Sequence, residues 1–201
     1  MSMLNDMRRA ERKERTRQEV LDAAREVIVA QGFAATTARD VAQRAGVAVG
    51  TVFAHFATMA RLAETLLDET VGQALAAVGD EPDGDDLVAQ LVHVSAALYD
   101  AYRADPELSR QVLSGSLFEA DPDGPSRRRM GEFAAWVGTR VHAAVTAGQI
   151  EPIDPQEAFL IYFALYFGVL GLGLRGELDA AGQTEMLDRM LRRVFRSAVR
   201  L

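Results

Sequence analysis

The chain has 201 residues, of which 49% are hydrophobic, and carries a net charge of −7. This length fits one or two domains with a substantial core. It contains no cysteine, which excludes disulfides and thiolate metal sites and fits a reducing, cytoplasmic setting. The first thirty residues are charged and amphipathic, unlike a secretory signal.

The charge is distributed unevenly along the chain. Residues 1–61 contain ten Lys and Arg against seven Asp and Glu, whereas residues 62–201 contain twelve against twenty-two. The balances are therefore +3 and −10. An acidic body joined to a modestly basic N-terminal part is compatible with nucleic-acid binding through that part alone.

Residues 1–14 are predicted to form a partly disordered arm that leads into the first helix, from about Arg12 to Gln31. The cations of this arm either reach DNA or are simply solvated, and the sequence leaves both interpretations open. These cations are Arg8, Arg9, Arg12 and Lys13.

The pattern that follows is typical of two short helices joined by a tight turn. Thr37 is the expected N-cap of the first, and Asp40 is placed to complete a variant capping box. Gly46 supplies the left-handed conformation that ends a helix, and Val47 fills the gap between the two helices. The second helix is predicted from about Val49 to Phe56, so the segment reads as a helix-turn-helix.

The second of these helices has a small, nearly uncharged outer face. Val52 and Phe56 point inward at a spacing of four, which leaves Gly50 and its neighbours outward. Glycine costs a helix about 1 kcal/mol relative to alanine, and close approach to a DNA backbone would explain it. A small helical core with a glycine turn is the alternative.

Several short motifs occur in a fixed order: Gly32-Phe33, Thr36-Thr37, Val-Ala-Gln-Arg-Ala-Gly-Val over 41–47, and Gly-Thr-Val-Phe-Ala-His-Phe over 50–56. With the flanking helices, residues 15–66 resemble the DNA-binding domain of the tetracycline-repressor (TetR) family of bacterial regulators. The resemblance implies that Arg39, Val49, Gly50 and Ala54 face base edges. It likewise implies that Thr37, Thr51, Phe53 and His55 lie along phosphates.

Three positions depart from the family pattern. The family usually has Ser or another polar residue at Ala48, Tyr at Phe53 and Lys at Met59. The missing hydroxyl and cation weaken the expected phosphate anchoring, for which Arg61 would compensate in part. A dimeric small-molecule or protein-binding module with a weakened DNA head is therefore the alternative function.

The rest of the chain reads as helices, with no alternating strand pattern. The acidic run 79–86 is predicted to be a solvated connection with a helix cap at Asp85 or Asp86, and a calcium loop is much less favoured. Arg127 to Arg129 are interpreted mainly as solvated charge, with an anion site as the alternative. The expected helices are about Met59–Val78, Leu87–Arg103, 106–118, Arg127–Ala147, Ala158–Leu174 and Thr184–Val199.

The segment Ala158–Leu174 is the most apolar in the chain, and Gly168, Gly171 and Gly173 allow close helix approach. Its seventeen residues are marginal for a bilayer, which needs about 20. Burial against protein is favoured, with a membrane-associated protein as a further class. A second subunit would cover this segment and the last helix, which predicts a dimeric four-helix bundle.

No catalytic, cofactor or metal site is predicted, because the histidines lack ligand spacing and no enzyme motif is present. Aromatic and histidine side chains of the body are candidates for an effector pocket, as the resemblance implies for this region, with ordinary core packing as the alternative for each. These candidates are His93, Tyr99, Tyr102, Phe118, Phe133, Trp136, His142, Phe163 and Tyr166.

We therefore expect an all-α protein with a helix-turn-helix domain and N-terminal arm at 1–60 and a ligand-binding, dimerising domain at 61–201. As the resemblance implies, it would be a cytoplasmic, ligand-released repressor. It would bind a pseudo-palindromic double-stranded DNA operator as a homodimer, with an apolar or aromatic small-molecule effector and no membrane.

Overall fold

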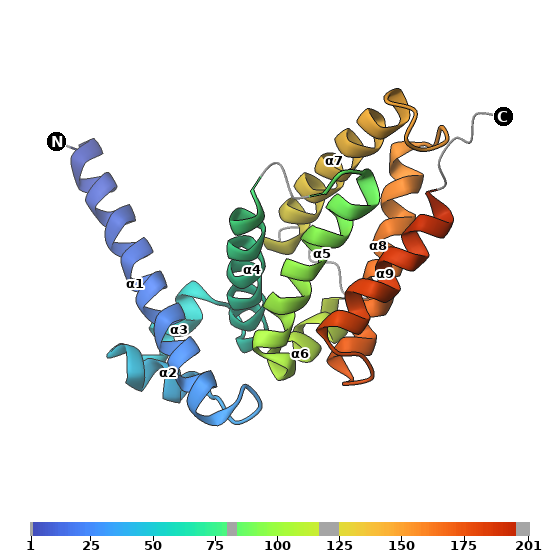
Figure 1. Cartoon of the computed structure of the whole chain (residues 1–201). Coiled ribbons are helices and arrows are strands. Elements are labelled where there is room, and N and C mark those ends of the chain that lie inside the picture. Colours follow the sequence, from blue (N-terminus) through green and yellow to red (C-terminus); the bar gives the residue numbers. More distant parts are fainter. Residues whose placement is uncertain (1, 80–83, 117–124, 196–201) are drawn as a thin grey trace. The chain divides into compact units, whose positions relative to one another are not determined.

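The computed structural model describes residues 2–79, 84–116 and 125–195, and within these ranges every regular element is an α-helix (Figure 1). The predicted all-α class is thus confirmed. The helices are α1 Ser2–Gln31, α2 Ala38–Ala45, α3 Val49–His55, α4 Met59–Val78, α5 Leu87–Ala104, α6 Pro106–Ser116, α7 Pro125–Thr146, α8 Pro155–Leu174 and α9 Ala180–Val194.

Two compact units divide the chain, Met1–Leu67 and Asp68–Leu201, and α4 contributes to both. In the first unit α1 packs against α2 and α3, and α2 packs against α3. Its core joins Val20, Leu21 and Ala24 of α1 to Val41 of α2 and Val52 of α3, and all five side chains are buried. Burial of these apolar groups holds the three helices together.

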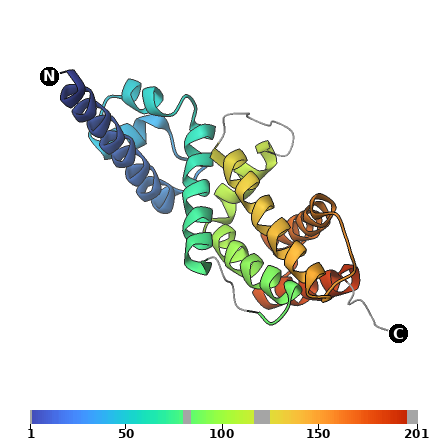
Figure 2. The ribbon, with the colours of Figure 1, turned by 90° about the horizontal axis from the view of Figure 1, so that it is seen from above.

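Helix α1 differs from the prediction. It begins at Ser2 and runs for 30 residues, so the expected arm is helical rather than partly disordered. Figures 1 and 2 show its N-terminal half extending past α2 and α3, and residues 5–15 are all exposed. Ala, Glu, Arg and Lys are good helix formers, and no glycine or proline interrupts the segment before Gly32.

In the second unit α8 packs against α7 and α9, and α5 packs against α8, α9 and α7. Side-chain caps fix where the helices start. Asp86 accepts a 2.8 Å hydrogen bond from the Ala89 N–H, which confirms the predicted cap of α5. Asp179 caps α9 at Ala180, four residues before the predicted start at Thr184.

All four tyrosines of the chain lie together in the second unit. Tyr99 and Tyr166 stack with ring centroids 5.2 Å apart, and the Tyr99 hydroxyl donates to the Tyr166 carbonyl. The Tyr162 hydroxyl lies 2.8 Å from Oγ of buried Ser95. Burial raises the pKa of Tyr99, Tyr162 and Tyr166, so these phenols stay neutral.

Arg129 is not solvated charge, contrary to the prediction. Its Nε and Nη2 donate to the two carboxylate oxygens of Asp68 at 2.7 and 2.8 Å. The guanidinium also lies against Gly72, where a Cβ would come within 2.4 Å of Nη1. Arg127 and Arg128 are exposed, as expected. This bidentate ion pair ties the second-unit part of α4 to α7.

The glycines of α8 have different surroundings. At Gly173 an added Cβ would clash with the amide end of Gln183, so the absence of a side chain makes room for this residue of α9. Gln183 is buried and donates to the Val169 carbonyl. At Gly168 nothing lies within 4 Å of the same position. Packing among the described residues therefore explains Gly173 but not Gly168.

Candidate nucleic-acid interface

The start of α2 is fixed by the predicted capping box. The Asp40 carboxylate accepts from the Thr37 N–H at 2.9 Å and from the Thr37 hydroxyl at 2.6 Å, and Thr37 Oγ1 accepts from the Asp40 N–H. Hydrogen bonding to Thr37 lowers the pKa of Asp40. The Thr37 hydroxyl proton is therefore engaged within the cap, although the residue is exposed.

The turn between α2 and α3 depends on Gly46. Its φ of 69° and ψ of 28° are left-handed, as the sequence predicted. The N–H of Val47 donates to the Ala42 carbonyl at 3.0 Å, which satisfies a free carbonyl at the helix end. This turn sets the direction in which α3 leaves α2.

Helix α3 buries Val52, and Phe56 at its C-cap is buried as well. The guanidinium of Arg17 lies over the Phe56 ring at 5.2 Å, a contact between α1 and the end of α3. The sequence pattern gave no indication of this contact, because its partners are far apart in the chain.

The outer face of α3 is apolar and open to solvent. Val49, Gly50, Phe53 and Ala54 are all exposed, and Phe53 retains 45% of its surface. A Cβ at Gly50 would meet nothing within 4 Å. No packing among the residues that the structure describes therefore requires a glycine there. Thr51 is half-buried.

His55 is half-buried at the last position of α3. Its Nδ1 atom is buried and has no hydrogen-bond partner among the described residues. Only the remainder of the ring is left to contact a ligand.

The cations near α3 differ in how they are paired. Arg39, near the start of α2, is exposed and forms no hydrogen bond or ion pair within the described residues. Arg44 pairs with Glu26, and Arg61 pairs with Glu64 at 3.0 Å. Arg39 is thus the more readily available cation of α2, whereas the expected substitute Arg61 already has a carboxylate partner.

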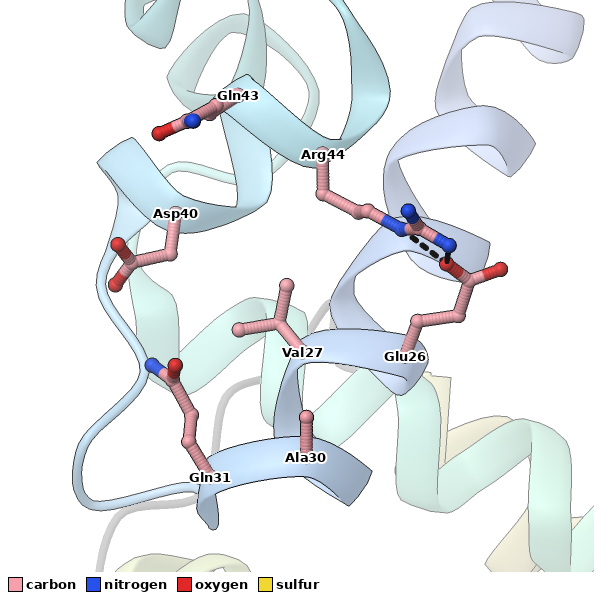
Figure 3. A pocket seen from close by; sticks show the side chains of 7 residues that line it. All are labelled: Glu26, Val27, Ala30, Gln31, Asp40, Gln43 and Arg44. Atoms are coloured by element: carbon pink, nitrogen blue, oxygen red, sulfur yellow. Dashed lines mark hydrogen bonds and ion pairs between the residues drawn. The ribbon is translucent and has the colours of Figure 1, made fainter.

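A hollow of about 520 Å³ lies between α1 and α2, as Figure 3 shows. Val27 and Ala30 line it with the Arg44–Glu26 pair on one side. Asp40 and Gln31 lie together on the other side. Its two carboxylates make it unsuitable for phosphate.

Comparison with known proteins identifies this unit. Residues 20–66 match the family model described as "Bacterial regulatory proteins, tetR family". The HTH-type transcriptional regulator SrpR of Pseudomonas putida is 30% identical over 171 residues, covering 82% of this chain and 78% of that protein. The chain belongs to the TetR family. TetR-family membership confirms a DNA-binding helix-turn-helix transcriptional regulator rather than an enzyme.

Other TetR-like relatives agree in sequence or fold. The HTH-type regulator YvkB of Bacillus subtilis is 31% identical over 83 residues, which cover 41% of this chain but only 43% of that protein. The crystal structure of a TetR transcriptional regulator from Rhodococcus sp. RHA1 has a TM-score of 0.65 at 19% identity. It covers 93% of this chain and 98% of its own, so the TetR-like fold extends through both units.

Most aromatic effector candidates belong to one connected cluster of rings in this TetR-family body, since Tyr162 contacts both Phe133 and Tyr166. Tyr99 and Tyr166 are buried and stacked on each other. Phe133 stacks on Trp136 with centroids 6.0 Å apart and touches Phe159 edge-on. Half-buried residues are His93, Tyr102, Phe133, Trp136 and Phe163, His142 is exposed, and Phe118 lies outside the described residues.

Proposed function

We propose that this TetR-family protein is a repressor that binds a pseudo-palindromic operator as a homodimer and is released by a small-molecule effector. The single observation that supports operator reading most directly is the exposed face of α3, and the exposed Arg39 lies on α2, which packs against α3. Val49, Gly50 and Ala54 would contact base edges in the major groove, where apolar groups recognise the thymine methyl. Arg39 would pair with a guanine.

The remaining positions of the family pattern are Thr37, Thr51, Phe53 and His55. Thr51 and the open part of the His55 ring would contact phosphates, because Asp40 uses both donors of Thr37 and Phe53 has no polar side-chain group. Ala48 gives α3 no side-chain cap, which weakens this helix end. This observation favours the second candidate, a binding module with a weakened DNA head. Operator selection separates the two.

Dimerisation is supported by the surface of α8. Only 33% of its most apolar window is buried within the chain, and Leu160 retains 67% of its surface. By length and composition α8 could also cross a membrane, but membership of a transcription-factor family makes protein the expected cover. Two copies related by a two-fold axis would bury this face and place two α3 helices in successive major grooves, about 34 Å apart.

Effector release would act through α4, which continues from the first unit into the second. An apolar or aromatic ligand would reach the half-buried rings of α7 and α8, which are Phe133, Trp136 and Phe163. A coupling of about 1–3 kcal/mol between ligand and DNA would lower operator affinity about 5- to 150-fold. The regulator would act in the cytoplasm, where its DNA is.

The deciding experiment is selection of random duplex DNA by the purified full chain. Enrichment of a two-fold-related motif is expected. Arg39→Ala should weaken binding to that motif about 5- to 150-fold for each half-site and relax the preference for guanine. The control Arg44→Ala removes a cation from the same helix that is already paired with Glu26, and it should change affinity only a few-fold. No enriched motif would favour the binding module instead.

Sedimentation of the same protein tests the dimer. Leu160→Lys should shift the chain towards monomer, because a charge on this face would have to be desolvated in the interface. Val29→Lys on α1, also highly exposed, is the control and should leave the mass unchanged. A monomer in the unmodified protein, or no effect of Leu160→Lys, would contradict this part of the proposal.

A further inference from the structure

The excess positive charge of the first unit lies almost entirely in the first half of α1. Residues 1–17 contain six Lys and Arg against three Asp and Glu, a balance of +3. Residues 18–61 contain four against four. Residues 18–61, which include α2 and α3, thus carry no net charge. The excess positive charge lies in the first half of α1, residues 2–17, which we call the extension.

The four cations of residues 18–61 are mostly used internally. Arg25 pairs with Asp22 at 2.9 Å, Arg44 with Glu26, and Arg61 with Glu64. Arg39 is left, and one cation contributes little to the phosphate attraction that dominates protein–DNA affinity. The departures at Phe53 and Met59 remove further anchors. Sufficient attraction must therefore come from elsewhere in this unit.

Three cations of the extension form a row along the helix that starts next to the end of α3. Arg9, Lys13 and Arg17 are spaced four apart and follow one ridge of the helix. Arg17 lies over the ring of Phe56, which ends α3. The ridge therefore starts beside the end of α3, and Lys13 and Arg9 follow about 6 and 12 Å further along the helix axis. Arg8 and Arg12 form the adjoining ridge.

Four cations of the extension have no ion-pair partner among the described residues. Arg8, Arg9, Arg12 and Lys13 are exposed and form no ion pair within the described residues. The extension is polar on nearly all sides, with Met7 as its one large exposed hydrophobic among the described residues, so it lacks the apolar stripe of a membrane-surface helix or coiled coil. A basic surface without an apolar face is complementary to a polyanion.

We propose that the N-terminal half of α1 is a second DNA-contacting element, in which Arg8, Arg9, Arg12 and Lys13 bind duplex phosphates. It supplies sequence-independent attraction, whereas α3 reads the bases. This inference rests on the proposed operator binding and adds to it the source of the electrostatic affinity. Glu14 is already paired with Arg17 at 3.5 Å, and Glu11 lies on the side of the helix away from Arg9 and Lys13.

The test is the salt dependence of operator binding by full-length variants that lose the same charge at two places. Arg8→Gln with Arg9→Gln removes an adjacent arginine pair from the extension. Arg127→Gln with Arg128→Gln removes an equivalent exposed pair from α7. Each phosphate contact contributes about 0.9 to the slope of log affinity against log salt. Because both subunits of the dimer carry the change, the α1 variant should lose up to about 3.6 in slope, and the α7 variant nothing.

Between 50 and 200 mM salt, that difference makes the unmodified protein lose up to about 150-fold more affinity than the α1 variant. The selected motif should stay the same, because bases are read elsewhere. Arg12→Gln with Lys13→Gln should repeat the effect, and circular dichroism of each variant shows whether its helices are retained.

Equal slopes for the unmodified protein and both α1 variants would overturn the inference while leaving operator binding intact. A slope that falls equally in the α7 variant would also overturn it, since net charge alone would then explain the effect. If the unmodified protein selects no operator, the proposed function itself fails and this inference fails with it.

Discussion

The Asp68–Arg129 ion pair gives the sharpest test of how the second unit is held together. The perturbation is Asp68→Asn, which keeps the shape of the side chain but removes its charge. One oxygen that accepted from the guanidinium becomes an amide NH₂, which opposes an Arg129 N–H. The two hydrogen bonds of 2.7 and 2.8 Å are thereby reduced to one at best.

The expected magnitude follows from burial. The Asp68 side chain is 13% exposed and that of Arg129 29%, so the pair lies between a surface bridge and a buried one. Surface pairs contribute about 0.2–1 kcal/mol, and removal of one partner from a fully buried pair costs about 3–5 kcal/mol. We expect a loss of about 2 kcal/mol in the free energy of unfolding, or about 4–8 °C in Tm for a chain of this size.

Thermal unfolding at one fixed protein concentration is the assay, because self-association makes Tm concentration-dependent. Asp188→Asn is the matched control. Asp188 accepts from Arg192 Nε at 2.9 and 3.1 Å, but the pair is 37% and 48% exposed and Arg192 also bonds Asp86. The control should lose less than about 0.5 kcal/mol. Equal Tm losses in the two variants would refute the reasoning from burial.

Three further predictions concern single side chains. Gly50→Ala should raise the free energy of unfolding by about 1 kcal/mol, because alanine favours a helix and the new Cβ meets open space in the protein. It should weaken operator binding, because the same Cβ would collide with bound DNA. The control Gly131→Ala, which is equally open, should stabilise the protein without changing operator affinity. Weakened binding by both would contradict this. Ser95→Ala should cost about 1–3 kcal/mol in denaturant unfolding by leaving the buried Tyr162 hydroxyl unpaired, and adding Tyr162→Phe should recover part of the loss; no recovery would mean that the two hydroxyls are not coupled. The hydrogen bond from Arg192 lowers the pKa of Asp86 below its ordinary 3.8. The ionised carboxylate therefore contributes fully to the free energy of unfolding above pH 3.8, and this contribution is lost as the pH falls through the lowered pKa. Asp86→Asn should therefore flatten the acid limb of a stability–pH curve below about pH 4 and leave its shape between pH 5 and 8 unchanged; an altered shape near neutrality would exclude this group as the cause.

Local signals explain why the helix-turn-helix was predictable. The Thr37–Asp40 box, the left-handed Gly46 and the inward Val52 each act within a few residues, and the structure confirms all three. The start of α4 at Met59 agrees as well. Such short-range rules need no knowledge of the tertiary fold.

Features that depend on distant partners were not predictable in the same way. Arg129 meets Asp68 across 61 residues, and Ser95 meets Tyr162 across 67. No spacing in the sequence indicates such pairs. The extension of α1 was missed for another reason, since a helix with charges on all sides has no hydrophobic period by which to recognise it. The effector candidates remain predictions, because apolar rings are equally suited to packing and to binding.

The distribution of aromatic rings gives the protein an intrinsic optical probe. The chain has one tryptophan, Trp136, which stacks on Phe133 and lies under the guanidinium of Arg140 at 5.0 Å. Residues 1–67 contain neither tryptophan nor tyrosine. Intrinsic tryptophan and tyrosine fluorescence therefore comes from the second unit alone. A conformational change or ligand binding in that unit can be followed without a label, and the first unit contributes no such fluorescence with or without DNA.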